Sequence, residues 1–136
     1  MLYALDHLQI AIPPQQEDRA RAFYVDVLGF TEVAKPASLA NRGGCWFEQG
    51  NIKLHLGVEP DFRPARKAHP AMLTDDLNAL IARCQAAGCE LQRDVPLDGY
   101  DRIHVFDPFG NRIELMQNYE NGINPRAKTK MDGAMA

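Results

Sequence analysis

Hydrophobic and polar residues alternate with a period of two near the end of the chain, a pattern typical of a β-strand with one buried face. Residues 107–111, Asp-Pro-Phe-Gly-Asn, are turn formers, and the alternation after them puts Ile113 and Leu115 on one face and Glu114 on the other. A carboxylate within an apolar strand costs free energy unless it is exposed or paired. Glu114 therefore needs an exposed face or a partner such as a metal ion.

The same period predicts further short strands, and spacings of three and four predict two amphipathic helices. The helices are expected at residues 17–28 and 75–87, with Gly29 and Gly88 as C-terminal caps and a carboxylate or threonine as the N-cap of the second helix. Gly50-Asn51 suits a two-residue hairpin turn. The expected strands are residues 5–12, 30–33, 45–49, 52–58, 69–74, 90–93, 102–106 and 112–117, with a loop at 35–42.

The order strand, helix and three strands occurs twice, and matching landmarks recur at a nearly constant separation. His7 precedes His69 by 62 residues, and His55 precedes Glu114 by 59 residues. This regularity indicates an internal duplication of a βαβββ unit, and we predict an α+β fold of tandem βαβββ modules that together form one domain. The expected boundaries are 1–58 for the first module, 59–67 for a linker, 68–118 for the second module and 119–136 for a C-terminal tail.

If one face of each strand packs on its helix, the opposite faces can line a shared cleft. The residues on these faces are unusually polar: His7, Gln9, Trp46, Glu48, Lys53, His55, His69, Arg102, His104, Arg112 and Glu114. A single histidine in a strand is usually a hydrogen-bonded residue. Two histidines and a carboxylate at repeated positions, however, suit a divalent first-row metal and leave positions open for a chelating substrate. We therefore predict that His7, His69 and Glu114 are metal ligands.

The remaining histidines are candidates for catalysis. His55 has three interpretations: a fourth metal ligand, a proton-transfer group beside the metal, or a hydrogen-bonded residue of the cleft. His104 lies outside the duplicated positions and is a candidate general acid or base. Together with Glu114, these two residues form the predicted catalytic set.

Five more polar or aromatic residues are candidates for contact with a substrate. Gln9 and Trp46 face the predicted cleft. Lys53, Arg102 and Arg112 either make this cleft cationic and favour an anionic substrate, or are solvated charges at its rim.

Composition narrows the range of partners. The 136 residues are 46% hydrophobic, which is enough for a buried core. The formal net charge is −3, and acidic and basic residues are interleaved along the chain, without the basic patch of a nucleic-acid or membrane-surface protein. We find no signal-peptide core and no apolar stretch near the about 20 residues of a membrane helix. The 3 cysteines have no CxxC spacing, which argues against a disulfide framework or a cysteine zinc site. We expect a cytoplasmic protein with small-molecule or protein partners.

Several motifs together resemble the vicinal oxygen chelate superfamily, which includes glyoxalase I, extradiol dioxygenases, fosfomycin resistance transferases and bleomycin resistance proteins. These motifs are Asp6-His7-Leu8, Ala22-Phe23-Tyr24 with Leu28-Gly29-Phe30, Asp75-Asp76-Leu77 and, above all, residues 107–114. The resemblance covers residues 2–118 and implies modules that form a curved mixed sheet around a metal-binding cleft, usually in a homodimer. It puts the family's metal positions on His7, His69 and Glu114, with His55 where glyoxalase I has a further carboxylate ligand.

The resemblance also implies a function. A glyoxalase-like enzyme of the lyase, transferase or dioxygenase type would use one divalent ion (Mn, Fe, Co, Ni or Zn) to chelate adjacent oxygens of a small substrate, anionic or thiol-linked, and to stabilise developing negative charge. The alternative is a metal-free protein of the bleomycin resistance type, in which Trp46 and other cleft residues bind a drug or metabolite. The presence of both histidines and the glutamate favours the enzyme.

Overall fold

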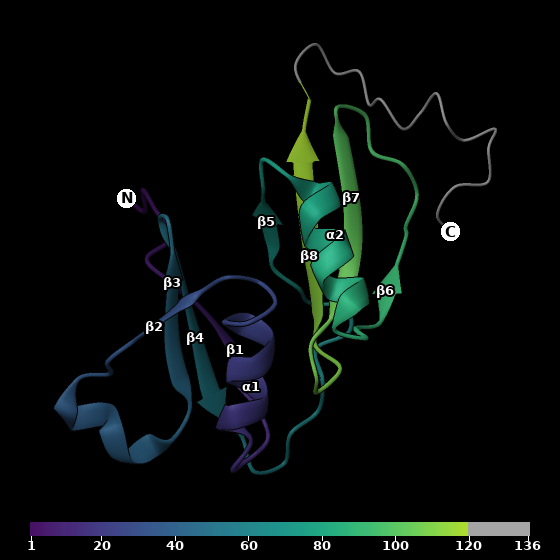
Figure 1. Ribbon diagram of the computed structural model, residues 1–136. Coiled ribbons are helices and arrows are strands. Elements are labelled where there is room, and N and C mark those ends of the chain that lie inside the picture. Colours follow the sequence, from purple (N-terminus) through teal and green to yellow (C-terminus); the bar gives the residue numbers. More distant parts are fainter. Residues whose placement is uncertain (120–136) are drawn as a thin grey trace. The chain divides into compact units, whose positions relative to one another are not determined.

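The computed structural model describes residues 1–119, which fall into two units, each with its own sheet and α-helix (Figure 1). The first unit is Met1–Arg66 with Asp107–Asn111, and the second is Lys67–Phe106 with residues 112–119. Each unit has the order strand, helix and three strands, so the predicted α+β fold of two βαβββ modules is confirmed. The predicted tail, apart from its first residue, lies outside the described residues.

The first unit forms a four-stranded mixed sheet in the order β1-β4-β3-β2. Strand β1 is parallel to β4, and the other neighbours are antiparallel. The predicted two-residue turn at Gly50-Asn51 is present, because Gln49 pairs with Ile52 and Gly50 supplies a positive φ of 57°. The elements are β1 (Leu8–Ile12), α1 (Glu17–Tyr24), β2 (Thr31–Val33), the 3₁₀-helix η1 (Ala37–Arg42), β3 (Cys45–Gln49) and β4 (Ile52–Val58).

The second unit repeats this topology with the strand order β5-β8-β7-β6. Strand β5 is parallel to β8, whose other neighbour, β7, is antiparallel. The helix begins as predicted at a carboxylate cap, since Asp76 accepts a hydrogen bond of 3.0 Å from the backbone N–H of Ala79. The elements are β5 (Ala71–Leu73), α2 (Leu77–Ala86), β6 (Leu91–Gln92), β7 (Tyr100–Phe106) and β8 (Arg112–Asn118).

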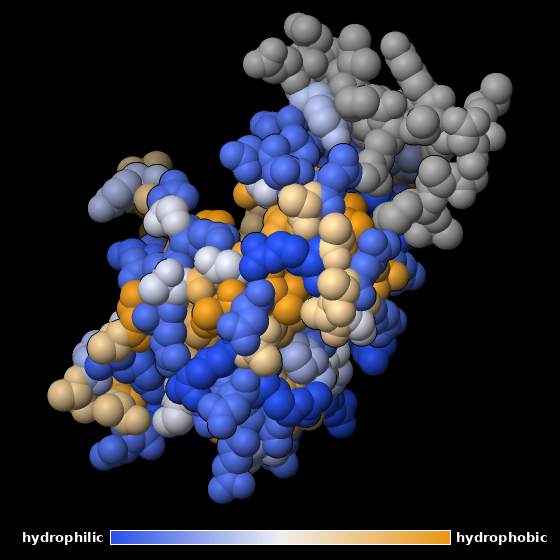
Figure 2. Space-filling view, viewed as in Figure 1, coloured by the Kyte–Doolittle hydropathy of each residue, from blue (hydrophilic) through white to orange (hydrophobic). Residues whose placement is uncertain are grey.

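Each sheet has one apolar face, as the alternation predicts. Ile12, Phe47 and Leu54 are fully buried in the first unit, and Val105 and Ile113 are fully buried in the second. Hydrophilic residues make up most of the face of the molecule seen in Figure 2. Within residues 1–119, no helix has the length and hydropathy needed to cross a membrane.

Four expected elements differ most from those observed, and the others match or differ by one or two residues at their ends. The first helix ends at Tyr24 rather than at residue 28, because the N–H groups of Asp26 and Leu28 bond carbonyls five residues back, in a wider turn that breaks the α pattern. The expected loop at 35–42 contains η1. The strands expected at 5–12 and 69–74 are shorter, so His7 and His69 lie just before β1 and β5 rather than within them.

The turn Asp107–Asn111 is held by side-chain hydrogen bonds within the first unit. The Asp107 carboxylate accepts from Tyr24 Oη at 2.8 Å and from the backbone N–H groups of Phe109 and Asn111 at 2.9 Å. Asn111 Nδ2 donates to Ala11 O at 2.9 Å. Burial, together with the Asp107 charge, raises the pKa of Tyr24 well above its ordinary value, so the phenol stays protonated and keeps donating.

Candidate metal centre

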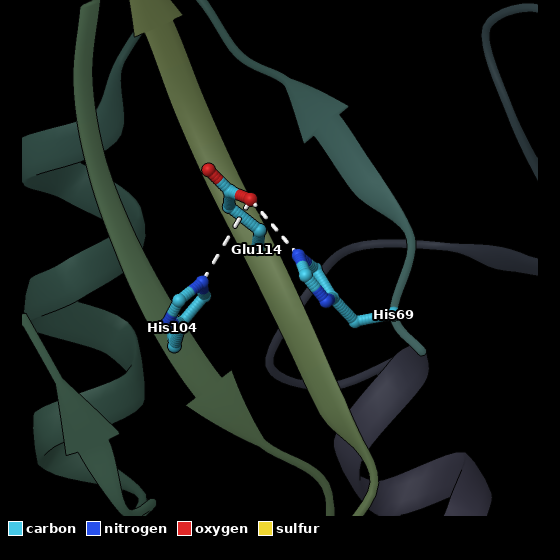
Figure 3. Close-up of side chains that lie close together, drawn as sticks. All are labelled: His69, His104 and Glu114. Carbon is cyan, nitrogen blue, oxygen red and sulfur yellow. Dashed lines mark hydrogen bonds and ion pairs between the residues drawn. The ribbon is translucent and has the colours of Figure 1, made fainter. Parts of the chain in front are cut away.

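Glu114 lies in the middle of β8, with two histidines directed at its carboxylate (Figure 3). His104 is its direct partner on β7, and His69 precedes β5, the strand on the other side of β8. Oε1 of Glu114 lies 3.1 Å from His69 Nε2 and 3.7 Å from His104 Nε2. The side chain of Glu114 is 8% exposed and that of His104 is 5% exposed, so this carboxylate and this imidazole lie largely out of reach of water.

The hydrogen bonds of His69 fix the tautomer of its neutral ring. The nitrogen that faces Glu114 is the one without a hydrogen. Nδ1 lies 2.8 Å from the backbone carbonyl of Lys67, which can only accept, so Nδ1 carries a hydrogen. A neutral His69 therefore presents the lone pair of Nε2 to a carboxylate oxygen at 3.1 Å. Two acceptors at this distance need a proton or a metal ion between them. Orientation of a ligating histidine by a backbone carbonyl is the usual arrangement at metal sites.

His104 supplies a second nitrogen to the same point. Its Nε2 is buried and has no hydrogen-bond partner within residues 1–119. Burial is the main cause that lowers the pKa of His104, and the positive charge of Arg112 adds to it, while Glu114 opposes both. The ring is therefore neutral near pH 7 and its nitrogens are available to a cation.

Arg102 holds the other oxygen of the glutamate. Its Nη1 lies 3.3 Å from Glu114 Oε2, while Nη2 donates to the carbonyl of Val95. Burial by itself would raise the pKa of Glu114, but a hydrogen bond from His69, which Nε2 can donate only in the protonated ring, and one from Arg102 outweigh it, and the pKa is lowered. Glu114 is consequently charged at neutral pH, with Oε1 directed at the two histidines.

The residues of this cluster fit a divalent metal ion. Two adjacent ligands of an octahedral ion, at about 2.1 Å each, lie about 3.0 Å apart, close to the distance between His69 and Glu114. The ligand atoms of His69, His104 and Glu114 all lie within 4.8 Å of one another. Two imidazoles and one carboxylate are the donor set of an open site for a first-row metal. The unpartnered nitrogen of His104 would then gain a partner.

The other predicted site residues that lie in the first unit gather on one face of its sheet. Trp46 stacks on His55 with ring centroids 3.8 Å apart, and His55 stacks on His7 at 4.2 Å. Gln9 pairs with His55 across β1 and β4. Burial, and next the charge of His7, lower the pKa of His55, so its ring is neutral. Lys53 lies two residues before His55 and is exposed.

Within each unit, the structure brings several of the predicted residues together. His69, Arg102, His104 and Glu114 lie together in the second unit, and Arg112 shares their face of the sheet. The ligand set predicted from the sequence also includes His7 and His55 of the first unit, and it stays a prediction.

The sequence alone gave His104 only an acid–base role, although a signal for its position was present. The hairpin turn is centred on Phe109, and His104 and Glu114 are each five residues from that centre. Equal distances from the centre of a regular hairpin put two residues opposite each other. Asp101 is buried and hydrogen-bonded to Arg93 at 2.8 Å. No comparable sequence pattern points to this residue, and the sequence did not predict it.

Comparisons with known proteins agree with this architecture. The family model described as the Glyoxalase/Bleomycin resistance protein/Dioxygenase superfamily matches residues 4–115. A glyoxalase family protein from Bacillus anthracis has a similar structure, with 42% sequence identity and a TM-score of 0.83 over 88% of this chain and 98% of that chain. "Glyoxylase I 4" from Arabidopsis thaliana is 26% identical over 125 residues, which cover 84% of this chain and 70% of the relative.

A more distant structure shares the fold alone. The fosfomycin resistance protein FosX from Listeria monocytogenes, in complex with Mn(II) and sulfate, has 13% identity and a TM-score of 0.68, covering 90% of this chain and 98% of that chain.

Proposed function

Because the chain belongs to the glyoxalase, bleomycin resistance protein and dioxygenase superfamily, we propose that it is a divalent-metal-dependent enzyme whose ion is held by His69, Glu114 and His104. One observation carries this proposal: the lone pair of a neutral His69 Nε2 faces the Glu114 carboxylate at 3.1 Å, beside a buried His104 nitrogen that has no partner within residues 1–119. A cation at this point would satisfy all three groups. FosX, whose complex contains Mn(II), supports the choice of ion class.

A bound divalent ion would supply Lewis acidity toward the oxygens of a small substrate and so stabilise developing negative charge. Other residues of the chain orient the side chains that would bind this ion. Lys67 O orients His69, and Arg102 holds Oε2 of Glu114 so that Oε1 stays toward the histidines. Whether the reaction is a lyase, transferase or dioxygenase reaction depends on the substrate, and the screen below addresses this choice.

The proposal also includes roles for residues of the first unit, which are predicted from the sequence alone. His7 and His55 as further ligands, His55 as a proton-transfer group, and Gln9, Trp46 and Lys53 as substrate contacts are expectations from the sequence. A homodimer and a cytoplasmic location are likewise expected from the sequence.

Metal analysis tests the proposal directly. The purified, untagged protein is incubated in turn with Mn²⁺, Co²⁺, Ni²⁺ and Zn²⁺, freed of excess metal and analysed for bound metal, beside the variants His69→Ala and His104→Ala. We expect one ion per chain in the natural protein and a large loss in both variants, with unchanged circular dichroism. As a matched control, the exposed carboxylate of Glu90 in the same unit is changed to glutamine, which should retain the metal.

Absence of stoichiometric metal, with folding that is unaffected by a chelator, would overturn the proposal and favour a metal-free binding protein. If metal is bound, the adduct of methylglyoxal with glutathione, fosfomycin with thiols, and catechols are screened for turnover. The substrate that turns over identifies the reaction class.

A further inference from the structure

Two arginines share the polar face of the second sheet, and they differ in their partners. Arg102 is engaged on three sides, by Glu114, by the carbonyl of Val95 and, at 3.9 Å, by Asp94. The side chain of Arg112 has no hydrogen bond or ion pair within residues 1–119, although the Nε atoms of both arginines are buried without a partner. Arg112 is therefore the arginine of this face that is free to bind an anion.

The position of Arg112 puts its charge beside the metal centre. It lies two residues before Glu114 on β8, so both side chains are on the same face of the sheet. Its guanidinium carbon lies 5.8 Å from the centre of the Phe106 ring, which belongs to the opposite residue on β7. The positive charge of Arg112 also contributes to the lowered pKa of His104, after burial, so its field reaches the cluster.

The ring of Phe106 gives the guanidinium a fixed platform. A cation over an aromatic face is attracted to it and loses mobility, but the contact leaves the N–H donors of the guanidinium unpaired. The alternative, a solvated charge at a rim, fits Lys53 better. Lys53 holds the equivalent position in the first unit, is exposed, and has Glu48 rather than an aromatic residue opposite. Arg112 is half-buried, and an unpaired half-buried guanidinium is stabilised by an incoming anion.

We propose that the substrate of this metal centre carries a carboxylate near its chelating oxygens, and that the Arg112 guanidinium binds this carboxylate. The inference rests on the proposed function, because it assumes that a metal ion at His69, His104 and Glu114 takes the chelating oxygens. The planar guanidinium matches a carboxylate in shape as well as in charge. Arg102 is a positioning residue for Glu114 and does not contact the substrate.

The test compares three ligands that share one pair of vicinal oxygens and differ in their carboxylate. Catechol has none, 3,4-dihydroxybenzoate has one on the ring, and 3,4-dihydroxyphenylacetate has one a methylene further away. Binding of each to the Ni²⁺-loaded protein is measured by isothermal titration calorimetry without oxygen. The variants are Arg112→Gln, Arg112→Lys and, as a matched control, Arg42→Gln, which removes an exposed arginine of the first unit.

We expect at least one of the two acids to bind about tenfold or more tightly than catechol, the gain of a charge-assisted hydrogen bond. Arg112→Gln should remove this gain, Arg112→Lys should restore part of it, and Arg42→Gln should retain all of it. Nickel content should be equal in every variant, and Arg112→Gln should change the affinity for catechol less than the affinity for the tighter-binding acid. The proposal is overturned if neither acid gains over catechol, or if the gain survives in Arg112→Gln. Failure of nickel to bind would instead overturn the proposed function and the inference with it.

Discussion

His55 and Glu114 occupy equivalent positions in the two units but differ in charge, since His55 is neutral and Glu114 is negative. Each lies in the strand that runs parallel to the first strand of its unit, each is buried, and each contacts the histidine that precedes that first strand. His7 stacks on His55 with ring centroids 4.2 Å apart, whereas His69 approaches Glu114 with an N–O distance of 3.1 Å. The two units therefore share the place of this central residue and differ in its chemistry.

The neighbours of these residues explain the difference. Opposite His55 is Trp46, and two residues before Trp46 is Gly44, which has no side chain to offer. Opposite Glu114 is His104, and two residues before it is Arg102, which holds the carboxylate. The first unit thus surrounds its central residue with rings, and burial keeps that residue neutral. The second supplies hydrogen bonds from His69 and Arg102, which outweigh burial and keep a carboxylate charged.

The strongest test of this contrast removes each central residue in turn. Glu114→Gln should weaken metal binding by about 100-fold or more, because even the partners of ligands change affinity by 10–100-fold. His55→Gln should change metal affinity much less, because His55 is not one of the three residues, His69, His104 and Glu114, whose ligand atoms cluster within residues 1–119. Titration calorimetry with Mn²⁺ or Ni²⁺ measures both. Comparable losses in the two variants would show that the equivalent positions perform the same function, as a four-ligand set predicts, and would contradict the contrast.

A smaller effect is expected when Arg102 is changed. Arg102→Gln should leave Glu114 in place but remove a hydrogen bond that lowers its pKa, and metal affinity should fall by about tenfold. Since protons then compete better with the metal, the pH at which half the metal is released should rise. Arg102→Lys, which keeps the charge without the planar fork, should recover part of the affinity. A release pH that rises no more than the lower affinity alone requires would indicate a purely structural role for Arg102.

The contributions of Glu114 and His55 to the free energy of unfolding should be lost in different pH ranges. The folded pKa of Glu114 is below its usual 4.5, so its contribution to stability is present above 4.5 and is lost as the pH falls through the folded value. The folded pKa of His55 is below its usual 6.5, so its contribution begins to be lost below 6.5. In the metal-free protein, urea unfolding should show a flatter acid limb for Glu114→Gln and a flatter limb near neutral pH for His55→Gln. Identical profiles for the two variants would contradict these assignments.

The fold could be predicted from the sequence because its signals are local and repeated. Alternation, the glycine after the second helix and the Gly50-Asn51 turn each depend on a few neighbouring residues, and the alternation occurs in both units. The predicted cap Gly29 was wrong, because the first helix ends at Tyr24 with Val25 as its C-cap. Apart from the 3₁₀-helix within the expected loop at 35–42, the errors fall at element ends. His7 and His69 were placed inside strands, because alternation does not show where a ladder of hydrogen bonds begins.

The candidate site was predicted less completely, because its geometry depends on pairing between strands. Residue type and repeat position gave His69 and Glu114 as partners, and these two are in contact. The contact of His104 with Glu114 depends on hairpin register, and the different partners of Arg102 and Arg112 depend on side-chain packing. Composition and periodicity describe one strand at a time and contain neither kind of information.

The smallest expected effect uses Trp46, the single tryptophan of the chain, as a reporter of the first unit. Its ring lies 3.8 Å from that of His55, and a protonated imidazole in this contact quenches indole fluorescence. In the metal-free protein, fluorescence should therefore fall on acidification with a midpoint below 6.5, because burial lowers the pKa of His55. His55→Gln should abolish this transition and Glu114→Gln should leave it unchanged. A midpoint that moves in Glu114→Gln would mean that His55 titrates in response to the carboxylate of the other unit, and the two equivalent residues would then form one coupled system rather than two independent ones.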